Sequence, residues 1–284
     1  MNKKVSAARL SIFSNTGLII LKLIVGLISG SVSIISEAIH SFMDLLASII
    51  AFFSVRISDK PADERHPYGH GKFENISGVV EAVLIFVAAF WIIYEAIKKI
   101  INPSEVEQIG FGFFVMIISG VVNIFVSKKL YSVAKETDSV ALEADALHLK
   151  TDVYTSFGVA IGLGLLWITG LHLLDPIIAI LVALLILKES FELFTRAYAP
   201  LLDITLPVKD VETISNIISR HCNENMSFHN LRTRKAGNYK YIDFHLNLDE
   251  NKTVKEAHAI CDRIEEDITA KFDHAEVNIH VENF

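Results

Sequence analysis

The order of apolar and polar positions divides the chain into six long apolar segments followed by a part with shorter periods. A membrane-spanning helix needs about 20 largely apolar residues. Residues 109–127 and 153–174 are uncharged runs of that length, and the other segments reach it only when each span includes a few polar residues. We therefore predict six transmembrane helices, which contain residues 10–36 with Lys22 inside, 45–55, 82–94, 109–127, 153–174 and 176–187.

Turn-forming pairs separate these segments. Asn102-Pro103 lies between two of them, and Asp175-Pro176 precedes the last. Asp is a favoured N-cap and Pro a favoured first helical residue, so Asp175-Pro176 predicts a helix start. The alternative is that the shorter runs are buried helices of a soluble bundle, but the spacing of the turn signals favours membrane spans.

The patterning of residues 203–284 predicts a small soluble fold. Residues 241–248 alternate between polar and apolar side chains, which is the period of a half-buried strand. Two other stretches have helical spacing. We predict an α+β domain of element order αββαβ with its helices on one side of a short sheet: a helix over 208–222, two strands within 231–248, a helix over 253–272 and a strand over 276–282.

Composition supports this division of the 284 residues. Hydrophobic residues make up 51% of the chain before glycine is counted, which is high for a soluble protein, and the mean hydropathy is +0.42. The net charge of −7 shows no basic footprint for nucleic acid. Two distant cysteines exclude a disulfide scaffold and a thiolate zinc finger. We predict a six-helix transmembrane domain over 1–202 and a soluble domain over 203–284.

The distribution of Lys and Arg predicts the topology. Cytoplasmic loops of membrane proteins carry an excess of Lys and Arg. In this chain, the loops at the other ends of the predicted spans contain almost no Lys or Arg. Both termini are therefore expected in the cytoplasm of a multi-pass protein of the inner or plasma membrane, without a cleavable signal peptide. The basic residues that locate the cytoplasmic side are Lys3, Lys4, Arg9, Arg56, Lys60, Arg65, Lys72, Lys128, Lys129 and Lys135.

Two predicted spans carry the same polar motif, His-x-x-x-Asp. The second span contains His40 and Asp44, and the fifth contains His148 and Asp152. A spacing of four places both side chains on one helical face. Two such faces opposed would give two imidazoles and two carboxylates, a ligand set suited to tetrahedral Zn²⁺.

The expected depth of these residues strengthens the metal hypothesis. Asp44 and Asp152 fall near the middle of their spans, where one aspartate costs about 2.5–3.5 kcal/mol on insertion scales. The second and fifth spans run antiparallel, which sets Asp44 level with His148. The alternatives are a neutral His–Asp hydrogen bond that joins two helices, or a path for protons or sodium without a heavy metal.

Three motifs together resemble the cation diffusion facilitators, and bacterial zinc exporters in particular. They are SEAIHSFMD at 36–44, KPADERHPYGHGK at 60–72 and ADALHLKTD at 144–152. The resemblance covers nearly the whole chain. It implies six transmembrane helices, a cytoplasmic metal-binding dimerisation domain with a ferredoxin/metallochaperone-like αββαβ fold, a homodimer in the lipid bilayer, and export of divalent metal ions in exchange for protons by alternating access.

The resemblance also implies which residues bind metal. The transport site would consist of His40, Asp44, His148 and Asp152. Some bacterial members with Asp at the position of His40 accept cadmium as well as zinc, whereas His there resembles the zinc-preferring members. Zn²⁺ is therefore expected as the substrate and as a regulatory ion, and Mn²⁺, Fe²⁺, Co²⁺ and Cd²⁺ are the alternatives.

Three further sets of residues match positions in this family. Two of the sets are rich in histidine, one in the loop 63–70 and one in the tail, and the alternative is that these histidines are merely solvated. The third set is the pair Lys72–Asp203, and the alternative is a surface ion pair that contributes little to stability. Strand alternation directs His245, His280 and Glu282 to one side of the sheet, and Asp is frequent in the family where Glu282 stands. The sets are Asp63, His66 and His70 in a loop; His229, His245, His258, His280 and Glu282 in the tail; and the pair Lys72 and Asp203 near the dimer axis.

Enzyme motifs are missing from the sequence. It has no His-Glu-x-x-His, no Gly-x-Ser-x-Gly and no phosphate-binding Gly-Lys-Ser/Thr loop. We expect a transporter, with no organic cofactor and no nucleic-acid partner, driven by an ion gradient. A membrane-tethered metal sensor that does not transport is the other class that the residues allow.

Overall fold

The structure is a computed structural model that describes residues 3–29, 32–101, 111–169 and 173–283. The chain forms two compact units. One comprises residues 1–69 with 73–198, and the other comprises residues 70–72 with 199–284. Each unit is described by itself below.

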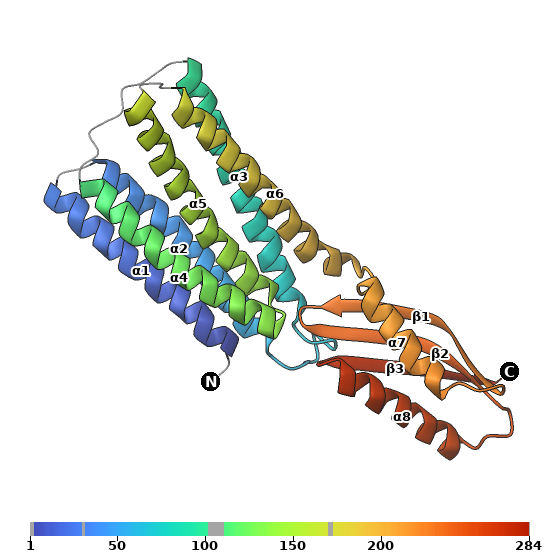
Figure 1. The fold of residues 1–284 in the computed structure, drawn as a ribbon. Coiled ribbons are helices and arrows are strands. Elements are labelled where there is room, and N and C mark those ends of the chain that lie inside the picture. Colours follow the sequence, from blue (N-terminus) through green and yellow to red (C-terminus); the bar gives the residue numbers. More distant parts are fainter. Residues whose placement is uncertain (1–2, 30–31, 102–110, 170–172, 284) are drawn as a thin grey trace. The chain divides into compact units, whose positions relative to one another are not determined.

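The first unit consists of six long helices that pack side by side (Figure 1). Each has 25–30 residues, a length of about 38–45 Å at 1.5 Å per residue. By length and composition, three stretches of the described residues are apolar enough to cross a membrane: Lys3–Val25, Lys72–Ile101 and Ile117–Thr137. The helices are α1 (Lys3–Ser29), α2 (Val32–Ser58), α3 (Lys72–Ile101), α4 (Phe111–Thr137), α5 (Val140–Thr169) and α6 (Leu174–Tyr198).

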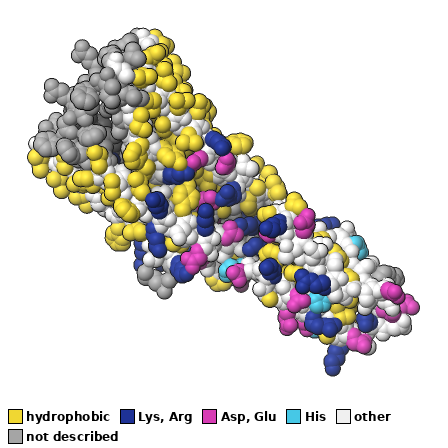
Figure 2. Space-filling view, in the orientation of Figure 1, with side chains coloured by type: hydrophobic (Ala, Val, Ile, Leu, Met, Phe, Trp, Pro, Cys, Tyr) yellow, Lys and Arg dark blue, Asp and Glu magenta, His cyan; other side chains and the backbone are white. Residues whose placement is uncertain are grey.

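Side-chain size is distributed in this unit as in a membrane protein. Small residues such as Ala8, Ala82 and Ala144 are fully buried where helices meet, and small side chains let helix backbones approach closely in lipid. Figure 2 shows apolar side chains over most of the visible face of these helices. Large apolar side chains that point outward include Phe13, Ile28, Trp91, Phe125 and Leu181.

The second unit is a three-stranded sheet with two helices. Its strand order is β1-β2-β3, with β1 antiparallel and β3 parallel to the central strand. Isoleucines of both helices pack on the apolar residues of β2 in one core, so the helices cover one face of the sheet. The elements are a 3-10 turn at Ala199–Leu202, α7 (Val208–His221), β1 (Met226–Ala236), β2 (Tyr239–Leu248), α8 (Val254–Lys271) and β3 (Ala275–Asn283).

Local sequence explains the turns of this unit. Thr253 and Glu256 form a capping box that starts α8. Gly237 adopts a positive φ of 61° in the turn between β1 and β2, a conformation that glycine tolerates without strain. A Cβ on Gly71 would lie 2.2 Å from the carbonyl oxygen of Ala236, so glycine is also required where residues 70–72 touch this turn.

The predicted fold class is confirmed: six long membrane helices and an αββαβ unit. One detail was wrong, because β1 begins at Met226 rather than near residue 231, and His229 therefore lies inside the strand and not before it. Residues 226–229 alternate between apolar and polar side chains, but the alternation breaks at Asn230, where the pairing with β2 shifts register between His229 and Arg232. A bulge of this kind hides a strand from sequence patterning.

Candidate metal sites

Three predicted ligands meet between α2 and α5. The ligand atoms of Asp44, His148 and Asp152 all lie within 4.8 Å of one another. His148 Nε2 and Asp44 Oδ1 are 3.0 Å apart, which is a hydrogen bond. Asp44 is buried, and the other two are partly buried. The Nδ2 of Asn123 on α4 donates to Asp152 Oδ2 at 3.5 Å, which is a long hydrogen bond.

This cluster lies far from the helix ends. Asp44 is near the middle of the 27-residue α2, and Asp152 lies in the first half of the 30-residue α5. The backbone of His40 belongs to α2, one turn before Asp44, but its side chain lies outside the described part of the structure. The structure thus brings together three members of the predicted set of four.

A buried polar network that the sequence analysis did not assign borders this cluster. Asn15 donates to Ser48 Oγ at 2.7 Å, and Ser48 donates to Asp145 Oδ1 at 2.9 Å. Asp145 on α5 and Glu81 on α3 are both fully buried. The available signal was the position of Asp145 near His148 in the predicted fifth span and of Glu81 directly before the apolar run 82–94, because ionisable residues within a membrane are rare and usually functional.

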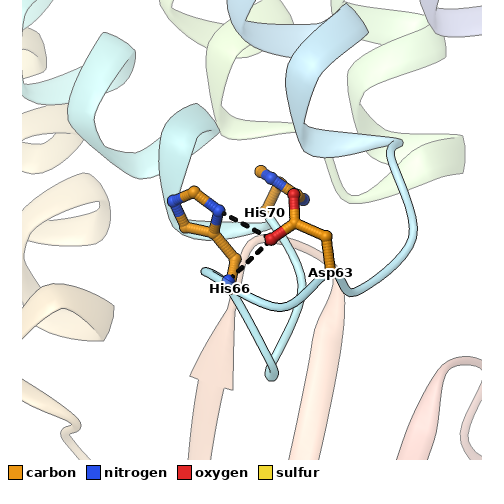
Figure 3. Close-up of side chains that lie close together, drawn as sticks. All are labelled: Asp63, His66 and His70. Carbon is orange, nitrogen blue, oxygen red and sulfur yellow. Dashed lines mark hydrogen bonds and ion pairs between the residues drawn. The ribbon is translucent and has the colours of Figure 1, made fainter.

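The loop before α3 forms a second cluster, drawn in Figure 3. The ligand atoms of Asp63, His66 and His70 lie within 4.8 Å of one another, with the Asp63 carboxylate between the two rings. The backbone N–H groups of Arg65 and His66 donate to Asp63 Oδ1 at 2.9 and 2.7 Å. These bonds, led by that from His66, lower the pKa of Asp63, so its carboxylate is charged and able to accept a cation.

The sheet of the second unit carries a third cluster, on the face opposite the helices. His229, His245 and His280 lie in one row, because His229 pairs with His245 and His245 with His280. The carboxylate of Glu282 lies within 3.0–3.5 Å of a ring nitrogen of each histidine. The ligand atoms of His229, His245 and Glu282 all fall within 4.8 Å of one another.

His258 is not part of this cluster. It lies on α8, on the helical side of the sheet, and its side chain is 77% exposed. Its Nε2 is 3.6 Å from Asp262 Oδ1, one helical turn away. The structure therefore separates His258 from the other four tail residues that the resemblance implied.

Lys72 and Asp203 form the ion pair that the resemblance implied. Lys72 Nζ donates to Asp203 Oδ1 at 2.9 Å, and Arg234 Nη1 lies 3.7 Å from the same oxygen. The hydrogen bond from Lys72, with the charges of both cations, lowers the pKa of Asp203 below its usual value. Both partners of the pair are more than one-third exposed, so solvent screening limits its contribution to stability.

This geometry gives a pH-dependent prediction for Asp203→Asn. A depressed folded-state pKa means that the carboxylate stabilises the fold above its unfolded pKa of about 3.9, and that this stabilisation is lost as pH falls through the folded value. We expect the variant to lose less than about 1 kcal/mol of unfolding free energy at neutral pH. Denaturant unfolding of the full chain in micelles should show the difference shrinking in acid; a difference that grows in acid would contradict the assignment.

Side chains of the types that bind metal ions, placed near the middle of two membrane helices, are typical of a transporter for cations, and comparison with known proteins agrees. The model of the cation efflux transmembrane domain matches residues 8–202, and that of the cytoplasmic domain of cation efflux proteins matches residues 206–284. The chain belongs to the cation efflux family, the cation diffusion facilitators. It is thus a multi-pass membrane transporter of the divalent cation efflux class.

Individual relatives align over most of the chain. The cation-efflux pump FieF of Shewanella oneidensis is 35% identical over 274 residues, which covers 96% of this chain and 92% of FieF. An uncharacterized transporter of Synechocystis is 34% identical over 90% of this chain and 82% of its own length. A solved structure of CzrB, described as a candidate zinc transporter, covers 28% of this chain and 98% of its own at 32% identity, with a TM-score of 0.27.

Proposed function

We propose that this protein exports Zn²⁺ from the cytoplasm in exchange for protons, by alternating access. The convergence of Asp44, His148 and Asp152 within 4.8 Å, deep between α2 and α5, carries the proposal. His40, one turn from Asp44 on α2, would supply the fourth ligand. Two carboxylates balance the charge of Zn²⁺, so the loaded site is nearly neutral and its transfer avoids an uncompensated charge in lipid.

The same atoms serve protons and metal. The contact between His148 Nε2 and Asp44 Oδ1 holds a proton, and this proton must leave before both atoms can bind a metal, since metal ligands bind in their deprotonated form. A site that opens to a more acidic side would therefore release metal and take up protons. This competition supports exchange rather than simple leakage.

Imidazole ligands favour zinc over the alternatives. Carboxylate and water suit Mn²⁺, whereas a set that mixes imidazole with carboxylate suits Zn²⁺. The same transporter with Mn²⁺, Fe²⁺, Co²⁺ or Cd²⁺ as its main substrate is the alternative. The direction of transport, out of the cytoplasm, is inferred from the family and not from the residues of the site.

The proposed organisation has two domains. Residues 1–202 form the transmembrane domain, and residues 203–284 form a cytoplasmic domain for metal binding and dimerisation. The protein is a homodimer of the inner or plasma membrane, with both termini in the cytoplasm. Lys72 and Asp203 would serve as a structural pair near the dimer axis.

The other clusters are proposed as secondary zinc sites. His229, His245, His280 and Glu282 would bind zinc as a regulatory ion on the exposed face of the sheet. Asp63, His66 and His70 would bind a metal ion more weakly, because Asp63 already accepts two backbone hydrogen bonds and the cluster is mostly exposed. His258 is one helix away from the tail cluster and would contribute only through a rearrangement.

The test is metal-driven proton flux in proteoliposomes, with Zn²⁺, Cd²⁺, Mn²⁺, Fe²⁺ and Co²⁺ compared and His40→Asp assayed beside the natural chain. We expect flux with Zn²⁺ in the natural chain and additional flux with Cd²⁺ in the variant, because a third carboxylate replaces an imidazole. Flux with Mn²⁺ or Fe²⁺ but not with Zn²⁺ would agree with the proposed transport activity and contradict zinc as the substrate.

The tail cluster supports one other function, that of a membrane-tethered metal sensor. A sensor would bind zinc at His229, His245 and Glu282 without moving it across the membrane. The same assay separates the two functions, because tight zinc binding with no flux of any metal would identify a sensor.

A further inference from the structure

A cavity of about 560 Å³ opens between α4, α5 and α6 within the six-helix unit. α5 packs against both α4 and α6, and each of the three helices contributes one face to the walls. The lining residues are Ile124, Ser127, Lys128, Tyr131 and Lys135 from α4; Glu143, Leu147, Lys150 and Val153 from α5; and Glu189, Glu192, Leu193 and Arg196 from α6.

This cavity is separate from the candidate transport site. At 100° per residue, Glu143, Leu147 and Lys150 share one face of α5, while Asp145, His148 and Asp152 lie on a face roughly 170° away. The full width of α5 therefore stands between the cavity and the metal ligands. The cavity therefore belongs to a different surface of the bundle from the one that carries the metal ligands.

The charges in the cavity leave an excess of cations. All three acidic lining residues already have a basic partner: Glu143 pairs with Arg196, Glu189 with Lys150, and Glu192 with Lys188 at 3.9 Å. Within the described part of the chain, Lys128 and Lys135 make neither an ion pair nor a side-chain hydrogen bond. Two turns apart on the same face of α4, they present uncompensated positive charge to the cavity.

The cavity combines this charge with an apolar interior. Lys135 lies near the end of α4, whereas Ile124 lies eleven residues deeper, about 16 Å along the helix. Lys150 and Tyr154 are held by Glu189 at 2.8 and 3.2 Å, so the deeper polar groups are satisfied internally. The walls around them include Leu147, Val153 and Leu193.

We propose that this cavity binds an anionic phospholipid. Its phosphate would lie between Lys128 and Lys135, and an acyl chain would follow the apolar wall toward Ile124. Basic pockets between transmembrane helices at the cytoplasmic side bind anionic head groups, and these lysines lie at the end of the bundle that the positive-inside rule assigns to the cytoplasm. The proposal depends on the membrane location of α4–α6 and not on which metal is transported.

The test is lipid binding by native mass spectrometry of the delipidated full chain in neutral detergent. The probe is phosphatidylglycerol, with phosphatidylcholine of the same acyl chains as the zwitterionic comparison and inorganic phosphate as a competitor. The test variant is Lys128→Gln/Lys135→Gln. The control is Lys129→Gln, which makes the same substitution once, at the adjacent exposed position of α4 outside the cavity lining.

We expect the natural chain and Lys129→Gln to bind phosphatidylglycerol with similar affinity, and more tightly than phosphatidylcholine. The double variant should bind phosphatidylglycerol about 30-fold more weakly, because each lysine near an anionic head group contributes roughly fivefold. Equal binding by the double variant would overturn the proposal. Displacement of the lipid by inorganic phosphate would assign a simple anion site instead, and a change in oligomeric state of the double variant would assign this face to contact between copies.

Discussion

Asp152→Ala should abolish zinc transport while the protein remains folded. The substitution removes one of the two carboxylates that balance the Zn²⁺ charge, and it takes away a ligand within 4.8 Å of those on Asp44 and His148. Loss of groups that only orient metal ligands already costs 10–100-fold, so we expect the initial rate of zinc-driven proton flux to fall by more than about 100-fold. The measurement is flux in proteoliposomes at matched protein density.

A matched control separates this effect from general damage to the membrane domain. Glu95→Ala removes a carboxylate from α3 that is 45% exposed and pairs only loosely with Lys98 at 3.6 Å. It should transport zinc like the natural chain. Both variants should keep the helical circular dichroism and the elution volume of the natural protein. Asp152→Ala with flux close to that of Glu95→Ala would contradict the placement of the transport site.

The parts of the structure that could be predicted depend on short-range periodicity. Apolar run length located all six long helices, and alternation along residues 241–248 located the central strand, because one face of that strand is buried against α7 and α8. The i, i+4 spacing of His148 and Asp152 placed both on one face of α5. The antiparallel order of the second and fifth spans set Asp44 level with His148, and their side chains are 3.0 Å apart in the structure.

Features that depend on distant partners could not be predicted in this way. Asp145 Oδ1 accepts a hydrogen bond from Ser48, which lies 97 residues earlier, and no local pattern links the two positions. Glu81 sits at the edge of an apolar run, where its burial depends on the packing of α3 against other helices. His258 has the residue type of a ligand, but the sheet separates it from the other tail histidines, and only the packing of α8 shows this.

The buried ion pair between Lys4 and Glu74 is another feature that depends on distant partners, and its removal should have the largest effect on stability. Glu74 is fully buried on α3, and Lys4 on α1 is 4% exposed. Lys4 Nζ donates to Glu74 Oε1 at 2.9 Å, Ser58 Oγ donates to the same oxygen at 2.7 Å, and Ser139 Oγ donates to the other oxygen. One carboxylate thus joins α1, α2, α3 and the turn before α5.

Glu74→Ala should lower the free energy of unfolding by about 3–5 kcal/mol, because it leaves a buried lysine without its main counter-charge. Asp59, with its Oδ1 3.5 Å from Lys4 Nζ, remains as a weaker partner and favours the lower end of that range. The double variant Lys4→Met/Glu74→Leu should recover much of the loss, since apolar residues often replace a buried ion pair at little cost. Denaturant unfolding in mixed micelles, followed by circular dichroism, measures all three proteins. A loss no greater than the roughly 0–1 kcal/mol of an exposed pair would show that Lys4 and Glu74 are solvated and do not hold these helices together.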